Sequence, residues 1–256
     1  HAKTTYENTK AQAQTQDGNQ VEYRLQTPIE VVWETTPRAK PEAIEGLDLE
    51  CDFNFLMVSQ ISPRKNFKKS IRWWVEEFID QEVGLIVKTN TVHGDLSEGQ
   101  MTHLYTHDKI KALVNIAHGE GFGLPMFEAA REGLPIITIG WSGQMDFLTH
   151  NGKNYYQKVK YSLGPVQSKA HWEGVIQPDS MWAFADGGSY KMVLRKVTKE
   201  YDRVKQTANE LKEIIQEKFS DEFLYDNFCK QVYGEQPVQD EEINRMFDEL
   251  TIGNES

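Results

Sequence analysis

The sequence predicts an α/β protein in which a doubly wound parallel sheet is covered by helices on both faces. Short apolar runs rich in branched residues alternate along the chain with longer segments whose apolar residues recur at helical spacing. Glycine, proline and asparagine mark the turns between the two kinds of segment. Because strands that alternate with helices pair in parallel, we expect ligands to bind outside the carboxyl ends of the strands.

The expected strands are short runs in which apolar and β-branched side chains dominate. The first run alternates apolar and polar residues as a half-buried strand does. The later runs are almost continuously apolar, which is typical of strands buried on both faces of a parallel sheet. In chain order the predicted strands are Pro28–Trp33, Phe53–Val58, Gly84–Lys88, Ala112–Ile116 and Pro135–Ile139.

The expected helices follow these strands. In the first of them Ile71, Trp74, Val75 and Phe78 fall on one face at helical spacing. Before the last of them Ser220, followed by acidic residues, is a helix-capping signal. The predicted helices are Phe67–Ile79, Gln100–His107, Leu124–Glu132, Ser142–Leu148, one or two helices within Tyr190–Lys218, and Ser220–Val232.

Four segments are expected along the 256 residues. Residues 1–27 are polar and compatible with a helix, and we expect a helical or junction segment there. Residues 28–218 form the sheet domain, which is large but within the size of one α/β unit. Residues 219–234 form a closing helix, and residues 235–256 form an acidic tail.

The net charge of −11 makes nucleic acid an unfavourable partner, because the chain as a whole repels phosphates. An anionic ligand must therefore be held by a local group of donors. No run reaches the about eighteen apolar residues that a membrane span needs, and the first residues do not resemble a signal peptide. We therefore expect a soluble, cytoplasmic protein without a membrane span.

The densest functional signal is the segment His118–Glu128, HGEGFGLPMFE, which follows a predicted strand and opens a predicted helix. Its three alternating glycines let the backbone approach a ligand, and the start of a helix presents N–H groups to an anion. Glu120 lies in the loop, and Glu128 lies in the helix on a face that can point to the same cleft. Because carboxylates accept hydroxyl hydrogen bonds, the pair suits a polyhydroxylated ligand.

Spacing alone leaves a structural interpretation of this segment equally open, because glycine turns between strand and helix are common. A kinase-like phosphate loop is less consistent, since Pro125 and a helix follow where a strand is needed and the sequence has no His-Arg-Asp loop. A dinucleotide fingerprint fails on its glycine spacing. No metal is expected, because the histidines lack a metal-ligand order and the chain has no Asp-x-Asp pair.

The same segment resembles the signature of retaining glycosyltransferases of the GT-B fold, family 4 type, in which seven residues separate two glutamates. Gly94–Tyr105 is similar to the family's segment before the signature, and Gly133–Ile137 with Trp141–Asp146 is similar to its continuation. The likeness covers roughly residues 53–150 and continues more weakly to Tyr233. It implies that the chain is the Rossmann-like, donor-binding half of a GT-B fold, with C-terminal helices after the sheet.

The resemblance also assigns roles to single residues. Glu120 would contact hydroxyls of the donor sugar, and Glu128 would contact the ribose hydroxyls of the nucleotide. In the family an arginine and a lysine neutralise the diphosphate; Lys65 matches the lysine, but Gln60 stands where the arginine is expected. Neighbouring Arg64 is the predicted replacement, which places Lys65 and Arg64 with Glu120 as the candidate catalytic residues. The other donor-binding positions are Gly121, Phe122, Gly123, Leu124, Gly143 and, near the base, Gly94.

The implied activity is transfer of a hexose from a nucleoside diphosphate sugar to a hydroxyl acceptor, with retention of anomeric configuration and without a metal or other cofactor. The acceptor, a glycan, lipid or small molecule, is not specified by the sequence. The N-terminal acceptor half of a GT-B enzyme has no counterpart in these residues and is expected from elsewhere. Two alternatives stay open: a non-catalytic nucleotide-sugar-binding or interaction module that lacks its acceptor domain, and a sugar epimerase with the same fold.

Overall fold

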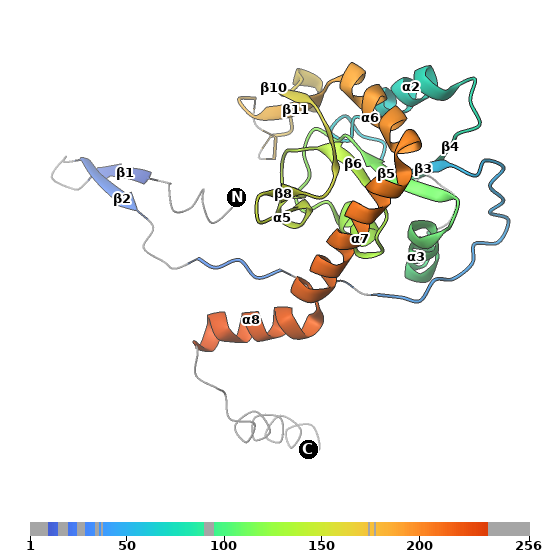
Figure 1. Cartoon of the computed structure of the whole chain (residues 1–256). Helices are drawn as coiled ribbons and strands as arrows, with labels where there is room; N and C mark the ends of the chain where they lie inside the picture. The colour runs from blue at the N-terminus through green and yellow to red at the C-terminus, as the bar shows by residue number, and fades with distance from the viewer. Residues whose placement is uncertain are drawn as a thin grey trace, which may run out of the picture. The chain divides into compact units, whose positions relative to one another are not determined.

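The computed structural model describes residues 10–14, 20–24, 29–33, 36, 38–89, 95–173, 175–176 and 178–234 (Figure 1). The chain divides into two compact units. One unit is Thr36–Glu217, and the other joins His1–Thr35 to Lys218–Ser256. Every sequence-predicted site residue that the structure describes belongs to the unit Thr36–Glu217.

A five-stranded sheet with the order β4-β3-β5-β6-β9 forms the centre of the larger unit, and every neighbouring pair in it is parallel. Its strands are β3 (Asn54–Val58), β4 (Gly84–Lys88), β5 (Ile110–Asn115), β6 (Ile136–Ile139) and β9 (Gln157–Val159). The chain adds β4 on one side of β3 and then crosses to add β5 on the other side. Between β3 and β5 the strand order therefore reverses, and such a switch point leaves a crevice at the carboxyl ends of the strands.

Different helices cover the two faces of this sheet. The helices are α2 (Phe67–Phe78), α3 (Glu98–Thr106), α4 (Leu124–Arg131), α5 (Met145–Leu148), α6 (Gly187–Lys199) and α7 (Tyr201–Lys218). α2 packs against α6, and their buried side chains meet Phe55, Val114 and Ile137 in one cluster. α3 and α4 pack against each other and against β5, where the alternate residue Leu113 is also buried. The predicted doubly wound α/β fold is therefore confirmed.

Most predicted boundaries agree with the structure to within two residues, which is the usual uncertainty of an element's end. α3 begins at Glu98 rather than Gln100 because Ser97 forms a capping box with Gln100. The helix expected from Ser142 is only α5, which begins at Met145. Ser142 has a φ of 81°, a left-handed conformation that does not belong to a right-handed helix.

The predicted helical segment over residues 1–27 is wrong in the part that the structure describes. Strands β1 (Lys10–Gln14) and β2 (Gln20–Arg24) pair there as an antiparallel hairpin. The alternating pattern of Gln20–Arg24, with a valine and a tyrosine, favours a strand. Residues 1–9, 15–19 and 25–27 lie outside the described part.

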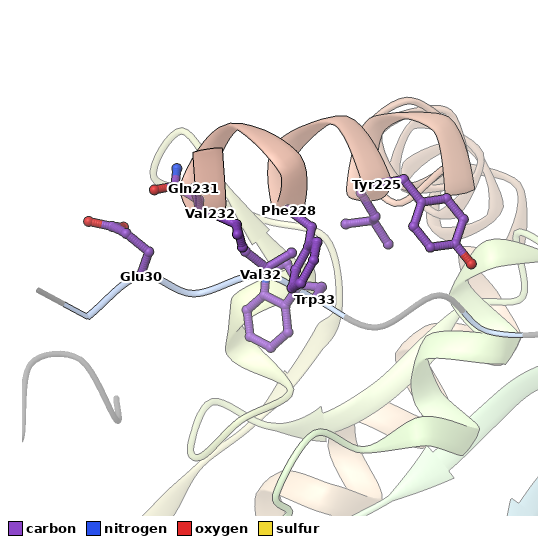
Figure 2. A pocket seen from close by; sticks show the side chains of 8 residues that line it. Glu30, Val32, Trp33, Tyr225, Phe228, Gln231 and Val232 are labelled. Carbon is purple, nitrogen blue, oxygen red and sulfur yellow. The ribbon is translucent and has the colours of Figure 1, made fainter. Parts of the chain in front are cut away.

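The strand predicted over Pro28–Trp33 is also wrong, because residues 29–33 are in no strand. Apolar alternation is not sufficient for a strand, which also needs a neighbour to accept its backbone hydrogen bonds. Instead Val32 and Trp33 line an apolar pocket together with Phe228 of α8 (Asp221–Tyr233), as Figure 2 shows. Leu224 of the same helix also lines it. The ring of Trp33 also lies 6.2 Å from that of Phe219, centroid to centroid. No predicted site residue lines this pocket.

Two hairpins in the larger unit were not predicted. β7 (Thr149–His150) and β8 (Lys153–Asn154) enclose Asn151 and Gly152, both at positive φ. β10 (Tyr161–Pro165) pairs antiparallel with β11 (Met181–Ala185). The predicted tail of residues 235–256 lies outside the described part of the chain. Among the described residues, no helix combines the length and the apolar composition that a membrane crossing requires.

Candidate functional site

The loops that follow β3 and β5 meet at the switch point of the sheet. The first loop leads from Val58 to α2 and carries Arg64 and Lys65, and the second leads from Asn115 to α4. The backbone N–H of His118 donates to the carbonyl of Arg64 at 2.8 Å. The side chain of Asn66, a left-handed residue at the start of α2, donates to the carbonyl of Ile116 at 3.2 Å. These bonds hold the two loops side by side.

Glu120 is the centre of the contacts between these loops. Lys65 Nζ donates to both carboxylate oxygens, at 2.6 Å to Oε1 and 2.7 Å to Oε2. Arg64 Nη1 donates to Oε2 at 3.0 Å and also contacts the carbonyl of Gly119. Asn115 Nδ2 donates to Oε1 at 3.2 Å. The structure therefore brings together all three candidate catalytic residues, and Arg64 reaches the site that the exposed Gln60 does not.

The ion cluster around Glu120 is largely shielded from water. The side chains of Glu120 and Lys65 are 6% and 14% exposed, whereas that of Arg64 is 38% exposed. Burial by itself raises the pKa of the Glu120 carboxyl, but the hydrogen bonds and charges of Lys65, with the bonds from Arg64 and Asn115, outweigh burial and hold that pKa below its usual value. Glu120 is therefore ionised at neutral pH, and the cluster carries one net positive charge.

The glycine loop is held in place by the loop that follows β6. Ser142 Oγ accepts from the N–H of Glu120 at 3.1 Å and donates to its carbonyl at 2.6 Å. The N–H of Gly143 donates to the same carbonyl at 3.1 Å. A Cβ on Gly143 would lie 1.6 Å from the carbonyl oxygen of Gly121, so only glycine fits there. Ser142 and Gly143 therefore fix the backbone position of Glu120.

The start of α4 lies directly after the glycine loop. Gly123 is the N-cap at a φ of 89°, a conformation that favours glycine. Pro125 has no N–H, and the N–H of Met126 donates to the carbonyl of Gly123 at 2.8 Å, so within the first turn only Leu124 has an N–H that the helix does not use and that can face an anion. The ring of Phe122 packs 5.1 Å from those of Phe127 and Phe147, which anchors the loop to the core, whereas Leu124 and Gly121 are exposed.

Glu128 stands on α4 and is held by a residue of α3. The buried hydroxyl of Tyr105 donates to Glu128 Oε2 at 2.8 Å. Burial raises the pKa of Glu128, and the bond from Tyr105 with the charge of Arg131 only partly offsets this effect. Burial and the adjacent Glu128 charge raise the pKa of Tyr105 far above its usual value, so the phenol stays a donor. One carboxylate oxygen of Glu128 is thus held, and the other can accept from a ligand.

Replacing Tyr105 with phenylalanine removes only this donor and leaves the ring. We expect the binding of a nucleoside diphosphate to weaken by roughly fivefold to tenfold, the worth of about one hydrogen bond. The binding of inorganic pyrophosphate, which has no ribose, should not change. Calorimetric titration of both ligands checks this expectation, and an equal loss for the two would contradict the positioning of Glu128 by Tyr105.

Several other predictions concern residues outside this cluster. Gly94 lies outside the described residues. His118 is buried: its Nδ1 lies 2.7 Å from the carbonyl of Ala183 and its ring stacks on Trp182. Burial lowers the pKa of His118, so it is a neutral residue that joins the site loop to β11. No group of three or more potential metal ligands occurs among the described residues.

Sequence reasoning missed three residues that shape the site. Asn115 interrupts an apolar strand at its carboxyl end, and this interruption was a usable signal. Ser142 occupies a turn in which no local pattern reveals its contact with Glu120. Tyr105 is on a different helix from Glu128, and only the tertiary fold brings the two side chains together.

No protein-family model matches the sequence, and no curated protein matches it. Among solved structures, the chain is similar to the pneumococcal O-GlcNAc transferase GtfA in complex with UDP and GlcNAc, with 18% identity, a TM-score of 0.46, and coverage of 70% of this chain and 35% of that one. It is similar to the C-terminal domain of the group 1 family glycosyl transferase LpcC from Francisella tularensis, with 12% identity, a TM-score of 0.45, and coverage of 66% and 87%.

A third similar structure is the catalytic domain of starch synthase IV from Arabidopsis thaliana bound to ADP and acarbose. The identity is 11%, the TM-score is 0.44, and the match covers 72% of this chain and 38% of that one. This chain therefore spans only about a third of the length of GtfA and of the starch synthase domain. At these identities a functional conclusion depends on this chain's own residues and their contacts.

Proposed function

We propose that this chain is the donor-binding half of a glycosyltransferase of the GT-B fold, and that it takes part in transfer of a hexose from a nucleoside diphosphate sugar. One observation carries the proposal. The carboxylate that opens the E-x7-E segment lies within 3.0 Å of both Lys65 and Arg64, at the switch point of a parallel sheet and beside the start of a helix. A donor needs these groups together: cations and N–H dipoles for its diphosphate, and carboxylates for its hydroxyls.

The diphosphate belongs at the positive end of this arrangement. The planar guanidinium of Arg64 suits a forked phosphate contact, and Lys65 supplies a compact charge. The N–H groups at the start of α4, from Phe122 to Leu124, add partial positive charge at the same place. Such groups, fixed before the reaction, stabilise the charge that develops on a leaving phosphate.

The hydroxyl groups of the donor belong at the two carboxylates. Glu128, held through Oε2 by Tyr105, accepts from the ribose hydroxyls with its other oxygen. Glu120 accepts from hydroxyls of the sugar, next to the bond that breaks. Both roles use carboxylates as acceptors, and charge-assisted hydrogen bonds of this kind contribute about 1.5–3 kcal/mol each.

In the proposed reaction the bond between the anomeric carbon and the β-phosphate oxygen breaks, and a bond to the acceptor oxygen forms on the same face. The acceptor hydroxyl gives its proton to the departing phosphate oxygen, and the nucleoside diphosphate leaves. Lys65 and Arg64 supply the positive charge that a metal ion supplies in other transferases. The acceptor half of the enzyme is a further part of the proposal, and it would close the cleft over the donor.

Titration with a panel of UDP-, GDP- and ADP-sugars tests this proposal. We expect saturable binding of one donor and a loss of about tenfold for Glu128→Gln, about 1.4 kcal/mol. Glu82→Gln is the matched control, because it removes a carboxylate from an exposed position just before the amino end of β4, whereas the site lies at the carboxyl ends of the strands. Equal weakening in both variants, or no binding of any donor, would contradict the donor site. Binding without donor turnover when an acceptor domain is added would favour the non-catalytic module.

A further inference from the structure

The carboxylate of Glu120 has no acceptor position left for a ligand. A carboxylate offers about four lone-pair positions on its two oxygens. Lys65 Nζ takes one on each oxygen, Arg64 Nη1 takes a second on Oε2, and Asn115 Nδ2 takes a second on Oε1. A sugar hydroxyl can therefore donate to Glu120 only after at least one of these donors leaves.

The three donors differ in how easily they can leave. Asn115 is buried, and its Oδ1 accepts from the N–H of Ala117 at 2.9 Å, so its amide is fixed from both ends. Lys65 and Arg64 are long side chains on a loop, and Arg64 is 38% exposed. The two cations are thus the exchangeable donors, and they are the groups that the proposed function assigns to the diphosphate.

We propose that Glu120 is an internal counter-ion that exchanges Arg64 and Lys65 with the donor's diphosphate. In the free chain the carboxylate of Glu120 forms ion pairs with both cations, as a phosphate would. When a diphosphate binds, its larger negative charge draws the cations away, and the acceptor positions that they vacate on Glu120 become available to the sugar hydroxyls. This inference rests on the proposed function and adds a coupling between the binding of the diphosphate and the binding of the sugar.

The exchange has a thermodynamic consequence. Because the same event fills the phosphate site and opens the sugar site, occupation of either one favours occupation of the other, and the two effects are equal by linkage. A sugar without a diphosphate meets a saturated carboxylate, so the site selects the intact donor over free sugar. Glu120 is then a specificity-determining residue as well as a sugar contact.

A fixed structural ion pair is the competing explanation, and it makes the opposite prediction for anion binding. If Glu120 only orients Lys65 and Arg64, its removal disorders the cations and weakens their binding of phosphate. If Glu120 competes with phosphate for them, its removal strengthens that binding. Inorganic pyrophosphate is the appropriate probe, because it has neither a ribose nor a sugar and so reports on the cations alone.

The experiment is calorimetric titration of inorganic pyrophosphate into the wild-type chain, Glu120→Gln and the control Glu82→Gln. We expect Glu120→Gln to bind roughly tenfold more tightly than wild type, because one competing charge-assisted interaction is gone. Glu82→Gln removes one carboxylate from an exposed position outside the site, and it should bind within about twofold of wild type. Glu120→Ala is a second variant that removes the charge without leaving an amide, and it should also bind more tightly.

The outcomes separate this inference from the proposed function. Folding of each variant is checked by thermal unfolding. If folded Glu120 variants bind pyrophosphate no more tightly than wild type, or if Glu82→Gln gains as much, the exchange is wrong while the donor site stands. If the wild-type chain binds neither pyrophosphate nor UDP, GDP or ADP, the proposed function is wrong, and the exchange with it.

Discussion

Replacing Lys65 with methionine is expected to lower both donor turnover and the stability of the chain. Turnover should fall by roughly a hundredfold to a thousandfold, because the leaving diphosphate loses one fixed positive charge. Glu120 would keep only Arg64 and Asn115 as partners, and leaving a buried charge poorly compensated costs about 3 kcal/mol. Denaturant unfolding and a donor-turnover assay with the acceptor domain present measure the two effects.

The pH dependence of stability tests whether the poorly compensated charge of Glu120 causes the destabilisation of Lys65→Met. In the wild-type chain the folded-state pKa of Glu120 is below the ordinary value of 4.5, so its contribution to stability is present above that pH and is lost as the pH falls through the folded pKa. In Lys65→Met, burial should raise the folded pKa, so the loss of stability should shrink between pH 7 and pH 5. A loss that is constant over this range would contradict the account.

The double variant Lys65→Met/Glu120→Gln separates stability from function. It replaces both charges with neutral groups of similar shape, and such replacements of buried pairs are often close to neutral. We expect its stability to recover most of the way toward wild type while donor turnover stays low. Recovery of turnover together with stability would show that Lys65 acts only through folding.

Replacing Gly143 with alanine is expected to displace the glycine loop and to abolish tight donor binding. The new Cβ would lie 1.6 Å from the carbonyl oxygen of Gly121 and 3.1 Å from that of Glu120, so the backbone must move. Overpacking of this kind costs about 1–3 kcal/mol. A displacement of about 1 Å at the site can cost a hundredfold in catalysis, and we expect a loss of donor affinity of similar size. Thermal unfolding and donor titration measure the two changes.

Gly121→Ala is the matched control for stability. This variant adds the same methyl group to the glycine loop itself. Nothing lies within 4 Å of a Cβ at Gly121. Its stability should stay within about 0.5 kcal/mol of wild type. If both alanine variants are equally destabilised, the clash between residue 143 and the carbonyl of Gly121 is not the cause.

The central strands β3, β5 and β6 were predictable because each is a short, largely buried apolar run between turn residues, whereas the edge strand β9 was not predicted. β5 and β6 are of this kind, and the helices between the strands carry apolar faces that their neighbours cover. These features are local, so they can be identified without knowledge of the fold. The glycine loop was predictable for the same reason, because its residues are contiguous in the sequence.

The elements that prediction missed depend on pairing or on distant contacts. Residues 29–33 alternate like a strand but pair with none, whereas β10 and β11 form a hairpin although fifteen residues separate them. In the site, Lys65 and Glu120 were predicted as separate parts, and their direct contact requires the two loops to be held together by His118 and Asn66. Neither the saturation of Glu120 nor the bond from Tyr105 to Glu128 has a signal in the sequence.

A crystal structure of the chain with the nucleoside diphosphate that binds in the titration panel tests the central claim most directly. We expect the diphosphate to lie against Lys65, Arg64 and the start of α4. The ribose should contact Glu128, and the two cations should have moved away from Glu120. A nucleotide bound elsewhere, or a switch point left empty at saturating concentration, would contradict the assignment of this site to a nucleotide-sugar donor.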